Sequence, residues 1–387
     1  MTSDEPAETW TITSRNVGSR RVEAVVDGVA VSVTSDKLPL ADVPEAWVTA
    51  FSLPAARAEA RLAVDRPVDP TWRAAADANV ATTSTWWGGA PHLALDAPDP
   101  ADAAAWRRRL RPRPKRGHPK SNRSTGRALC FTGGVDSFFS LLRDRHGPSH
   151  LLYVVGFDVD LDDTERADRV VALVHEVARA RRLAPLIVRT DLRTHPRFAA
   201  ISWEQTHGAA IAAIGLLLSP SIGAVTIPPS YASDRLIPWG SRPDLDPRWS
   251  VPGRTEIEHG DATERRLDRV AAIAHDPLVQ QHLRVCWQND GSALNCGRCE
   301  KCLRTMAMLA ATGVLDECRT FPPRSELPGR LAALDGLSTG QIPMWRDLLA
   351  IELRGLLKVI PRDYQRALAA KRAAAGSAAC FCDAALN

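Results

Sequence analysis

The chain has 387 residues, of which 45% are hydrophobic and 24% charged, a composition typical of a globular protein. This length predicts about two domains with a sizeable core. No run of eighteen apolar residues occurs, and the acidic N-terminus lacks the basic and apolar stretches of a secretory signal, so neither a membrane span nor secretion is expected.

Residues 1–106 are predicted to form a separate small β-rich domain. The segments 10–13, 22–26 and 29–33 alternate as strands do, and Asp27-Gly28 fits a tight hairpin turn between the last two. Residues 55–64 are a short helix candidate. No catalytic constellation occurs in this region.

Residues 107–127 form a basic segment with ten Lys/Arg and no acid. Removing these ten charges from the net +4 leaves −6 for the rest of the chain. Pro112, Pro114 and Pro119 interrupt any helix, which predicts a linker. A solvated linker is one interpretation, and contact with nucleic acid or an acidic partner is the other.

From residue 128 onward strands and helices alternate. Strands are predicted over 128–131, 151–157, 186–189 and 224–227, and helices from 138, over 164–182 and over 204–218. This rhythm predicts a doubly wound α/β domain over 128–325, with a mostly parallel sheet whose ligands bind at the carboxyl ends of the strands.

The stretch from Phe131 to Ser137 is the most informative motif. Gly133 and Gly134 lie between a predicted strand and a predicted helix, where a backbone without Cβ atoms lets a ligand approach the free N–H groups at the helix start. Thr132 and Ser137 add hydroxyl donors. Asp136 is able to cap the helix or hold a cation. These features predict a phosphate site, although no Gly-Lys pair of a Walker loop and no Gly-x-Gly-x-x-Gly occurs.

Four cysteines are spaced as metal ligands are. Cys286 precedes Cys296, Cys299 and Cys302, and thiolates in this number bind zinc or an iron–sulfur cluster. We expect a structural zinc, and therefore a reducing cytoplasmic location rather than disulfides.

The phosphate-site motif closely resembles the Ser-Gly-Gly-x-Asp-Ser loop of the PP-loop ATP pyrophosphatases, with Thr132 in the first serine position. A similar four-cysteine cluster occurs in the 7-cyano-7-deazaguanine synthases of that superfamily. The resemblance covers about residues 128–320. It implies ATP bound by residues 132–137 (Thr132, Gly133, Gly134, Val135, Asp136 and Ser137), with Mg²⁺, and transfer of AMP to a carbonyl or carboxylate oxygen with release of pyrophosphate.

Other candidate residues lie farther along the chain. Asp158 follows a predicted strand whose end borders the nucleotide in PP-loop enzymes, so it is a magnesium or ribose candidate, or simply a solvated side chain. His207 opens a predicted helix as a phosphate contact, a cap or a structural histidine. The loop 228–256 carries candidate substrate contacts, which are equally explained by packing: Trp239, Arg242, Trp249 and Arg254.

The function expected from this sequence is ATP-dependent adenylation of a carboxylate or amide-type oxygen, followed by attack of a nitrogen nucleophile. Its substrate would be a small molecule, a modified base or a peptide, and its catalytic candidates are Asp136, Ser137 and Arg254. One alternative is sulfur insertion, with Cys380 or Cys382 as carrier in the helical C-terminal segment and tail over 326–387. The other is a non-catalytic nucleotide- and zinc-binding protein that contacts nucleic acid through residues 107–127.

Overall fold

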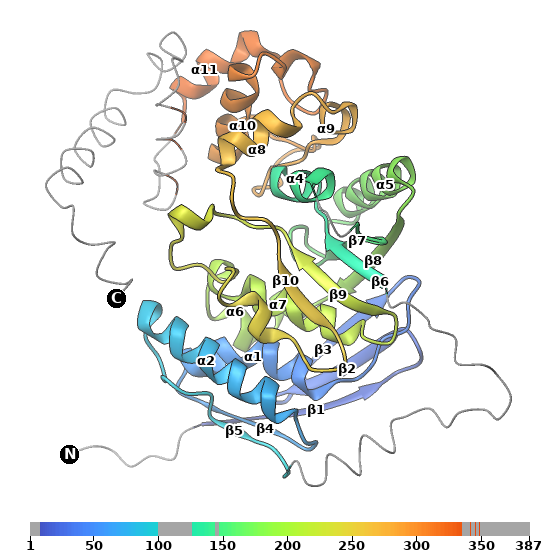
Figure 1. The fold of residues 1–387 in the computed structure, drawn as a ribbon, viewed down its shortest axis with the longest axis vertical. Helices are drawn as coiled ribbons and strands as arrows, with labels where there is room; N and C mark the ends of the chain where they lie inside the picture. The colour runs from blue at the N-terminus through green and yellow to red at the C-terminus, as the bar shows by residue number, and fades with distance from the viewer. Residues whose placement is uncertain are drawn as a thin grey trace, which may run out of the picture. The chain divides into compact units, whose positions relative to one another are not determined.

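The computed structural model describes residues 8–99, 126–143, 147–334 and the single positions 341, 345 and 348. The chain divides into two units (Figure 1). Unit 1 comprises Met1–Thr132 and Ser140–Glu264, and unit 2 comprises Gly133–Phe139 and Arg265–Asn387. Residues 107–125 of the predicted linker lie outside the described residues, as do Cys380 and Cys382 of the predicted tail.

Unit 1 is an α/β structure around one ten-stranded, mostly parallel sheet. The strand order is β10-β9-β6-β7-β8-β3-β2-β1-β4-β5. The strands span Thr9–Asn16 (β1), Arg21–Val26 (β2), Val29–Ser35 (β3), Arg61–Val64 (β4), Leu95–Asp96 (β5), Gly126–Cys130 (β6), His150–Val155 (β7), Ala184–Thr190 (β8), Ile222–Ile227 (β9) and Glu256–His259 (β10).

Strands β10, β9, β6, β7 and β8 run parallel to one another, which confirms the predicted strand–helix alternation after residue 128. Helix α5 (Thr164–Arg181) packs against β7 and β8, and α7 (Trp203–Leu217) packs against β9. The predicted bounds of these strands and helices are correct to within about two residues, apart from the helix after β6, which begins earlier. β10 was not predicted, because only one of its four residues is apolar and such a short segment shows no clear strand alternation.

The N-terminal strands extend this sheet instead of forming a sheet of their own. β3 pairs antiparallel with β8, in the register Val33↔Thr190 and Ser35↔Val188. Asp191 reinforces the junction by accepting from the backbone N–H of Ser32 at 2.7 Å. The three predicted strands and the turn at Asp27 are confirmed, but β-pairing between segments so far apart leaves no local signal in the sequence.

The helix expected over 55–64 is wrong. Helix α1 (Pro44–Arg57) ends there, Glu59 adopts a left-handed φ of 53°, and the chain continues as β4. Leu62 is fully buried and Val64 almost so, which is the alternation of a strand. The alanine-rich composition favours a helix, but residues 61–64 form a strand because they pair with β1.

Helix α1 is central to the core of unit 1. It packs against α7 and against α2 (Pro70–Trp87), and it buries Trp47 and Phe51. Asp69 caps α2 by accepting from the N–H groups of residues 71 and 72 at 2.9 and 3.2 Å. The short helix α6 (Pro196–Ala199) also contacts α1.

Unit 2 is helical where it is described. It contains α8 (Arg266–Ile273), α9 (Pro277–His282), α10 (Glu300–Ala311) and α11 (Leu327–Ala332), and α10 contacts both α8 and α11. Glu300 and Arg304 form a buried ion pair at 2.6 Å, and the indole N–H of Trp345 donates to the same carboxylate at 2.8 Å. Helix α4 (Val135–Arg143) starts in this unit, three residues before the predicted start. No helix among the described residues is long and apolar enough to cross a membrane.

Glu45 gives a test of the unit 1 core. Burial raises the pKa of its carboxyl, which accepts the N–H of Asp69 at 2.8 Å. The folded state therefore binds this proton more tightly than the unfolded chain, and stability falls as the pH rises above the ordinary glutamate range. Glu45→Gln keeps the acceptor and removes the charge. We expect it to raise the free energy of unfolding at pH 7 by on the order of 1 kcal/mol and to have little effect near pH 4.

Urea denaturation at the two pH values measures this difference. Glu23→Gln is the control of opposite sign, because hydrogen bonds from Arg21 and Arg15 lower the pKa of Glu23. If Glu45→Gln changed the free energy of unfolding equally at both pH values, the buried charge of Glu45 would not be what lowers stability at pH 7.

Candidate functional site

The glycine pair lies at the start of α4. Gly133 has a φ of 77°, a left-handed conformation that favours glycine. The carbonyl of Gly134 accepts from the N–H of Phe138 at 2.9 Å and from the hydroxyl of Ser137 at 3.0 Å, so Gly134 is the last residue before the helix. The next N–H groups belong to the first turn, where a helix offers no backbone acceptor. The loop therefore has a strand–turn–helix form, in which the N–H groups of a helix start are open to a ligand.

Asp136 is held by two arginines from α8. Arg266 contacts one carboxylate oxygen at 2.7 Å, and Arg269 contacts the other at 2.9 Å. Arg269 is fully buried, and its guanidinium also lies 5.7 Å from the ring centre of Phe139. Sequence reasoning missed these arginines. Their spacing of three places both on one face of a helix, which was the available signal.

The loop is also bonded to the segment that leads to the cysteines. The backbone N–H of Arg284 donates to the carbonyl of Gly133 at 2.8 Å, and Cys286 follows two residues later. The side chain of Arg284 donates to Asn289 at 2.9 Å. One short stretch therefore contacts the phosphate-site motif and supplies the first cysteine.

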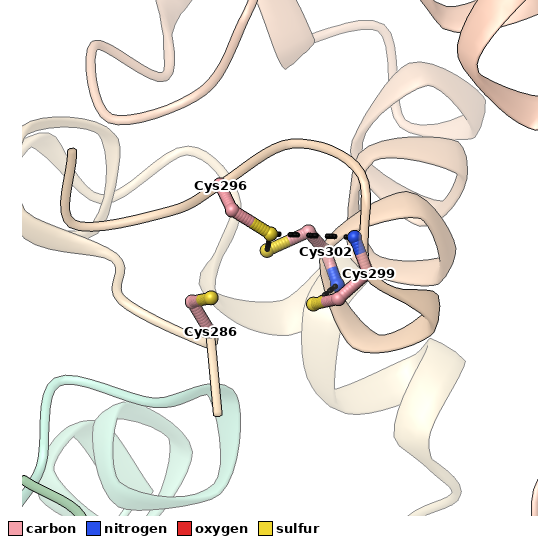
Figure 2. A group of neighbouring side chains, drawn as sticks. All are labelled: Cys286, Cys296, Cys299 and Cys302. Atoms are coloured by element: carbon pink, nitrogen blue, oxygen red, sulfur yellow. Dashed lines mark hydrogen bonds between the residues drawn. The ribbon is translucent and has the colours of Figure 1, made fainter. Parts of the chain in front are cut away.

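The four cysteines converge as the sequence predicts (Figure 2). Their sulfur atoms all lie within 4.8 Å of one another, and those of Cys296 and Cys302 are 3.9 Å apart. A zinc tetrahedron with ordinary Zn–S bonds has sulfur–sulfur edges of about 3.8 Å. The arrangement fits a zinc ion held by all four thiolates. Among the described residues no other such group of candidate metal ligands is found.

The turn between the ligands is built for this geometry. Cys296 accepts the N–H of Cys299 at 3.3 Å, and Cys299 accepts that of Cys302 at 3.4 Å as α10 begins. Gly297 has a φ of 65°, and a Cβ there would lie 2.5 Å from Pro322. N–H groups directed at sulfur stabilise thiolates, and the glycine allows the turn to close.

The electrostatics of the cluster favour a bound cation. Hydrogen bonds from the Cys299 and Cys302 thiols hold the pKa of Cys286 well below its usual range. The neighbouring Cys286 and Cys299 side chains hold the pKa of Cys302 far above it. Ionisation of one thiol thus opposes ionisation of its neighbour, and a dication would remove that opposition by binding all four as thiolates.

Asn295 fastens the cluster to its surroundings. Its carbonyl oxygen accepts the N–H groups of Val285 and Cys286 at 2.8 and 3.1 Å. Its amide donates to the carbonyls of Leu283 and Thr320 at 2.8 and 3.3 Å. This buried side chain is therefore fully hydrogen-bonded, and it joins the segment of Cys286 to the turn of Cys296.

In unit 1 the structure brings together two of the predicted residues, Asp158 and His207. Burial lowers the pKa of His207. The Asp158 carboxylate lies close enough for its negative charge to raise that pKa in part. His207 Nδ1 is 3.1 Å from the carbonyl of Trp203, and its ring lies 5.5 Å from that of Trp239.

Cys130, at the end of β6, carries a further thiol of this unit. Burial raises its pKa to about 12, so it is not a ready nucleophile.

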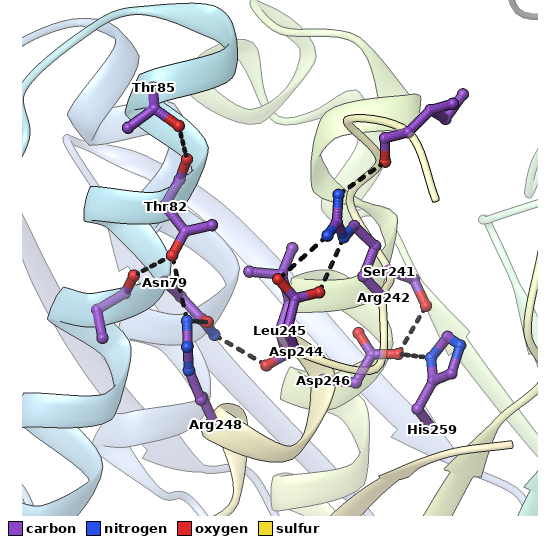
Figure 3. A network of polar contacts seen from close by, with 12 residues as sticks. Asn79, Thr82, Thr85, Ser241, Arg242, Asp244, Leu245, Asp246, Arg248 and His259 are labelled. Carbon is purple, nitrogen blue, oxygen red and sulfur yellow. Dashed lines mark hydrogen bonds and ion pairs between the residues drawn. The ribbon is translucent and has the colours of Figure 1, made fainter. Parts of the chain in front are cut away.

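A buried acid–histidine pair that the sequence analysis missed lies in the same unit (Figure 3). Asp246 is fully buried and accepts from the Ser241 hydroxyl, and Nδ1 of His259 lies 2.7 Å from the same oxygen. A hydrogen bond from Nδ1 to this carboxylate places the ring proton on Nδ1 and leaves Nε2 as an acceptor, which is the tautomer for acid–base chemistry. A Cβ on Gly208 would lie 3.0 Å from the other Asp246 oxygen.

Packing and pairing account for two of the four predicted substrate contacts in the loop 228–256, Arg242 and Trp249. Trp249 is buried in the core, and Arg242 pairs with Asp244 and lies over the ring of Trp86. Arg248 and the carbonyl of Leu245 bond to Asn79 of α2, as Figure 3 shows. The charge of Arg254 partly offsets the raised pKa of Glu45. A substrate role for Arg254 stays a prediction.

Comparisons with protein-family models, with curated proteins and with solved structures gave no match.

The metal site makes a direct prediction. The wild-type protein should contain one zinc per chain, and Cys286→Ala should lose it. Because structural zinc contributes on the order of 10 kcal/mol of binding free energy to a small fold, unit 2 should then unfold at lower denaturant concentration. Cys318→Ala is the matched control, since Cys318 is equally buried in the same unit but outside the cluster.

Elemental analysis and denaturant titration give both quantities. Wild-type protein without metal would contradict the zinc assignment. Brown protein with iron and sulfide would replace zinc with a cluster on the same four ligands.

Proposed function

We propose that this chain is an ATP-dependent adenylating enzyme of the PP-loop type. It transfers AMP to a carboxylate or amide-type oxygen, releases pyrophosphate, and allows a nitrogen nucleophile to displace AMP. The observation that carries the proposal is the loop at α4, which combines the sequence motif with a left-handed Gly133 and a helix start at Val135.

The chemistry follows from the leaving group. A carboxylate oxygen leaves poorly, whereas AMP leaves well, so adenylation makes the carbonyl carbon open to attack. The protein's contribution is positioning and charge neutralisation, and a bound Mg²⁺ would add positive charge at the phosphates. No histidine or cysteine nucleophile is required for this step.

The loop residues have distinct roles in this proposal. N–H groups of Gly134, Val135 and Asp136 hold phosphate oxygens, and the hydroxyl of Thr132 adds a donor. Ser137 acts on the loop itself, because its hydroxyl donates to Gly134. Asp136 keeps guanidinium charge beside the first helical turn through its two arginines. Roles for Asp158 and His207 toward the nucleotide stay predictions.

The loop is tested by Gly134→Val. A branched side chain at this position would occupy the space in which phosphate oxygens approach the backbone, so ATP affinity should fall at least tenfold. Gly329→Val is the matched control, because a Cβ on Gly329 in the same unit meets no atom within 4 Å. Calorimetry with ATP and Mg²⁺ measures both. Undiminished affinity in Gly134→Val would remove the phosphate site from this loop.

The reaction is tested by its products. With Mg²⁺, a panel of carboxylic acids and hydroxylamine as nucleophile, the expected products are AMP and pyrophosphate. The turnover should be low without an acid, because water is not the intended nucleophile. Nucleotide chromatography distinguishes the outcomes. ADP as the sole product would overturn adenylation, and ATP binding without turnover on any acid would favour a nucleotide-responsive binding protein.

A further inference from the structure

We infer that the four-cysteine metal site is a positioning element of the phosphate loop, acting through Asn295 and the backbone N–H of Arg284. This inference rests on the proposed nucleotide binding at residues 132–137. Every contact in the argument lies within unit 2.

The first step concerns one peptide plane. No cis peptide occurs among the described residues, so the carbonyl of Gly133 and the N–H of Gly134 point in opposite directions. The Arg284 N–H captures that carbonyl at 2.8 Å. Because the Gly133 carbonyl points toward Arg284, the Gly134 N–H points away from Arg284. A reversed peptide would direct a carbonyl oxygen where the N–H now points, and a carbonyl repels an anion.

The second step concerns what selects this orientation. Reversing the peptide changes ψ of Gly133 and φ of Gly134, and glycine allows both rotations at low cost. The loop thus has little intrinsic preference between the two orientations. The hydrogen bond from Arg284 supplies the preference, and it acts only while the segment 283–286 is held in place.

The third step concerns what holds that segment. Asn295 bonds to Leu283 on one side of Arg284 and to Val285 and Cys286 on the other. The hydroxyl of Thr320 adds a second donor to the Leu283 carbonyl at 2.6 Å. A metal bound by Cys286 and Cys296 would fix the two chain segments that Asn295 bridges. Metal binding and loop geometry are therefore expected to be coupled.

The coupling is tested with ATP and zinc as the probes. In zinc-depleted wild-type protein, ATP affinity should fall at least tenfold, and cadmium or zinc should restore it. Because linkage is reciprocal, saturating ATP should raise zinc affinity by the same factor in competition with a chelator. This second measurement uses the intact chain and does not depend on any variant folding.

Two variants locate the coupling. Asn295→Asp keeps the oxygen that accepts from residues 285 and 286 but loses the donors to Leu283 and Thr320. We expect it to retain zinc and to bind ATP at least tenfold more weakly. Cys318→Ala should leave both affinities unchanged. Circular dichroism and thermal melting establish that each variant is folded.

The outcomes separate this inference from the proposed function. If wild-type protein with zinc does not bind ATP, the proposed function fails. If it binds ATP equally well with and without zinc, and ATP leaves zinc affinity unchanged, ATP binding stands and the positioning role is overturned. A loss of ATP affinity in Cys318→Ala as large as that in Asn295→Asp would also overturn it, because any disturbance of unit 2 would then suffice.

Discussion

The hydrogen bond from the Arg284 N–H to the Gly133 carbonyl is the contact on which the candidate site depends. A loop that binds anions through its backbone needs glycine for close approach, but glycine also leaves the peptide planes free to turn. The restraint must therefore come from outside the loop. Here it comes from a segment whose neighbouring residues are bonded to Asn295 and whose end carries Cys286. The four-cysteine cluster and the loop are thus parts of one hydrogen-bonded arrangement, although about 150 residues separate them in the chain.

Unit 1 depends on a different constraint, the pairing of β3 with β8. This antiparallel junction makes one sheet from the N-terminal strands and the parallel strands after residue 126. Helix α1 then packs against α7, so that residues from both parts of the chain form a single core. The N-terminal region therefore cannot be understood as a module with a separate core. Its strands complete the sheet whose other half follows the alternation of the central region.

The sequence predicted what local patterns encode and missed what distant residues decide. Alternating strands, the turn at Asp27 and the four cysteine ligands have short-range signatures, and the structure agrees with each. The junction at β3 has none, because its partners lie more than 100 residues apart. The spacing of Arg266 and Arg269 places both on one helix face, but nothing local indicates that Asp136 is their partner. The helix expected at 55–64 failed for the same reason, since pairing with β1 outweighed the propensity of alanine. The buried pair of Asp246 and His259 was likewise invisible, because a lone aspartate and a lone histidine carry no pattern.

The arginines of α8 change how the motif aspartate is understood. A carboxylate beside the proposed phosphate site would be unfavourable unless cations compensated its charge. Both oxygens of Asp136 contact guanidinium groups. A Walker loop carries its lysine within the motif, whereas this chain has no Gly-Lys pair and brings arginines from α8 to the first turn of α4. Asp136 then acts through the charges that it positions. The loop consequently has two separate requirements. The arginine contacts set the charge beside the helix start, and the Arg284 backbone sets the direction of the N–H groups, so that a change in one need not alter the other.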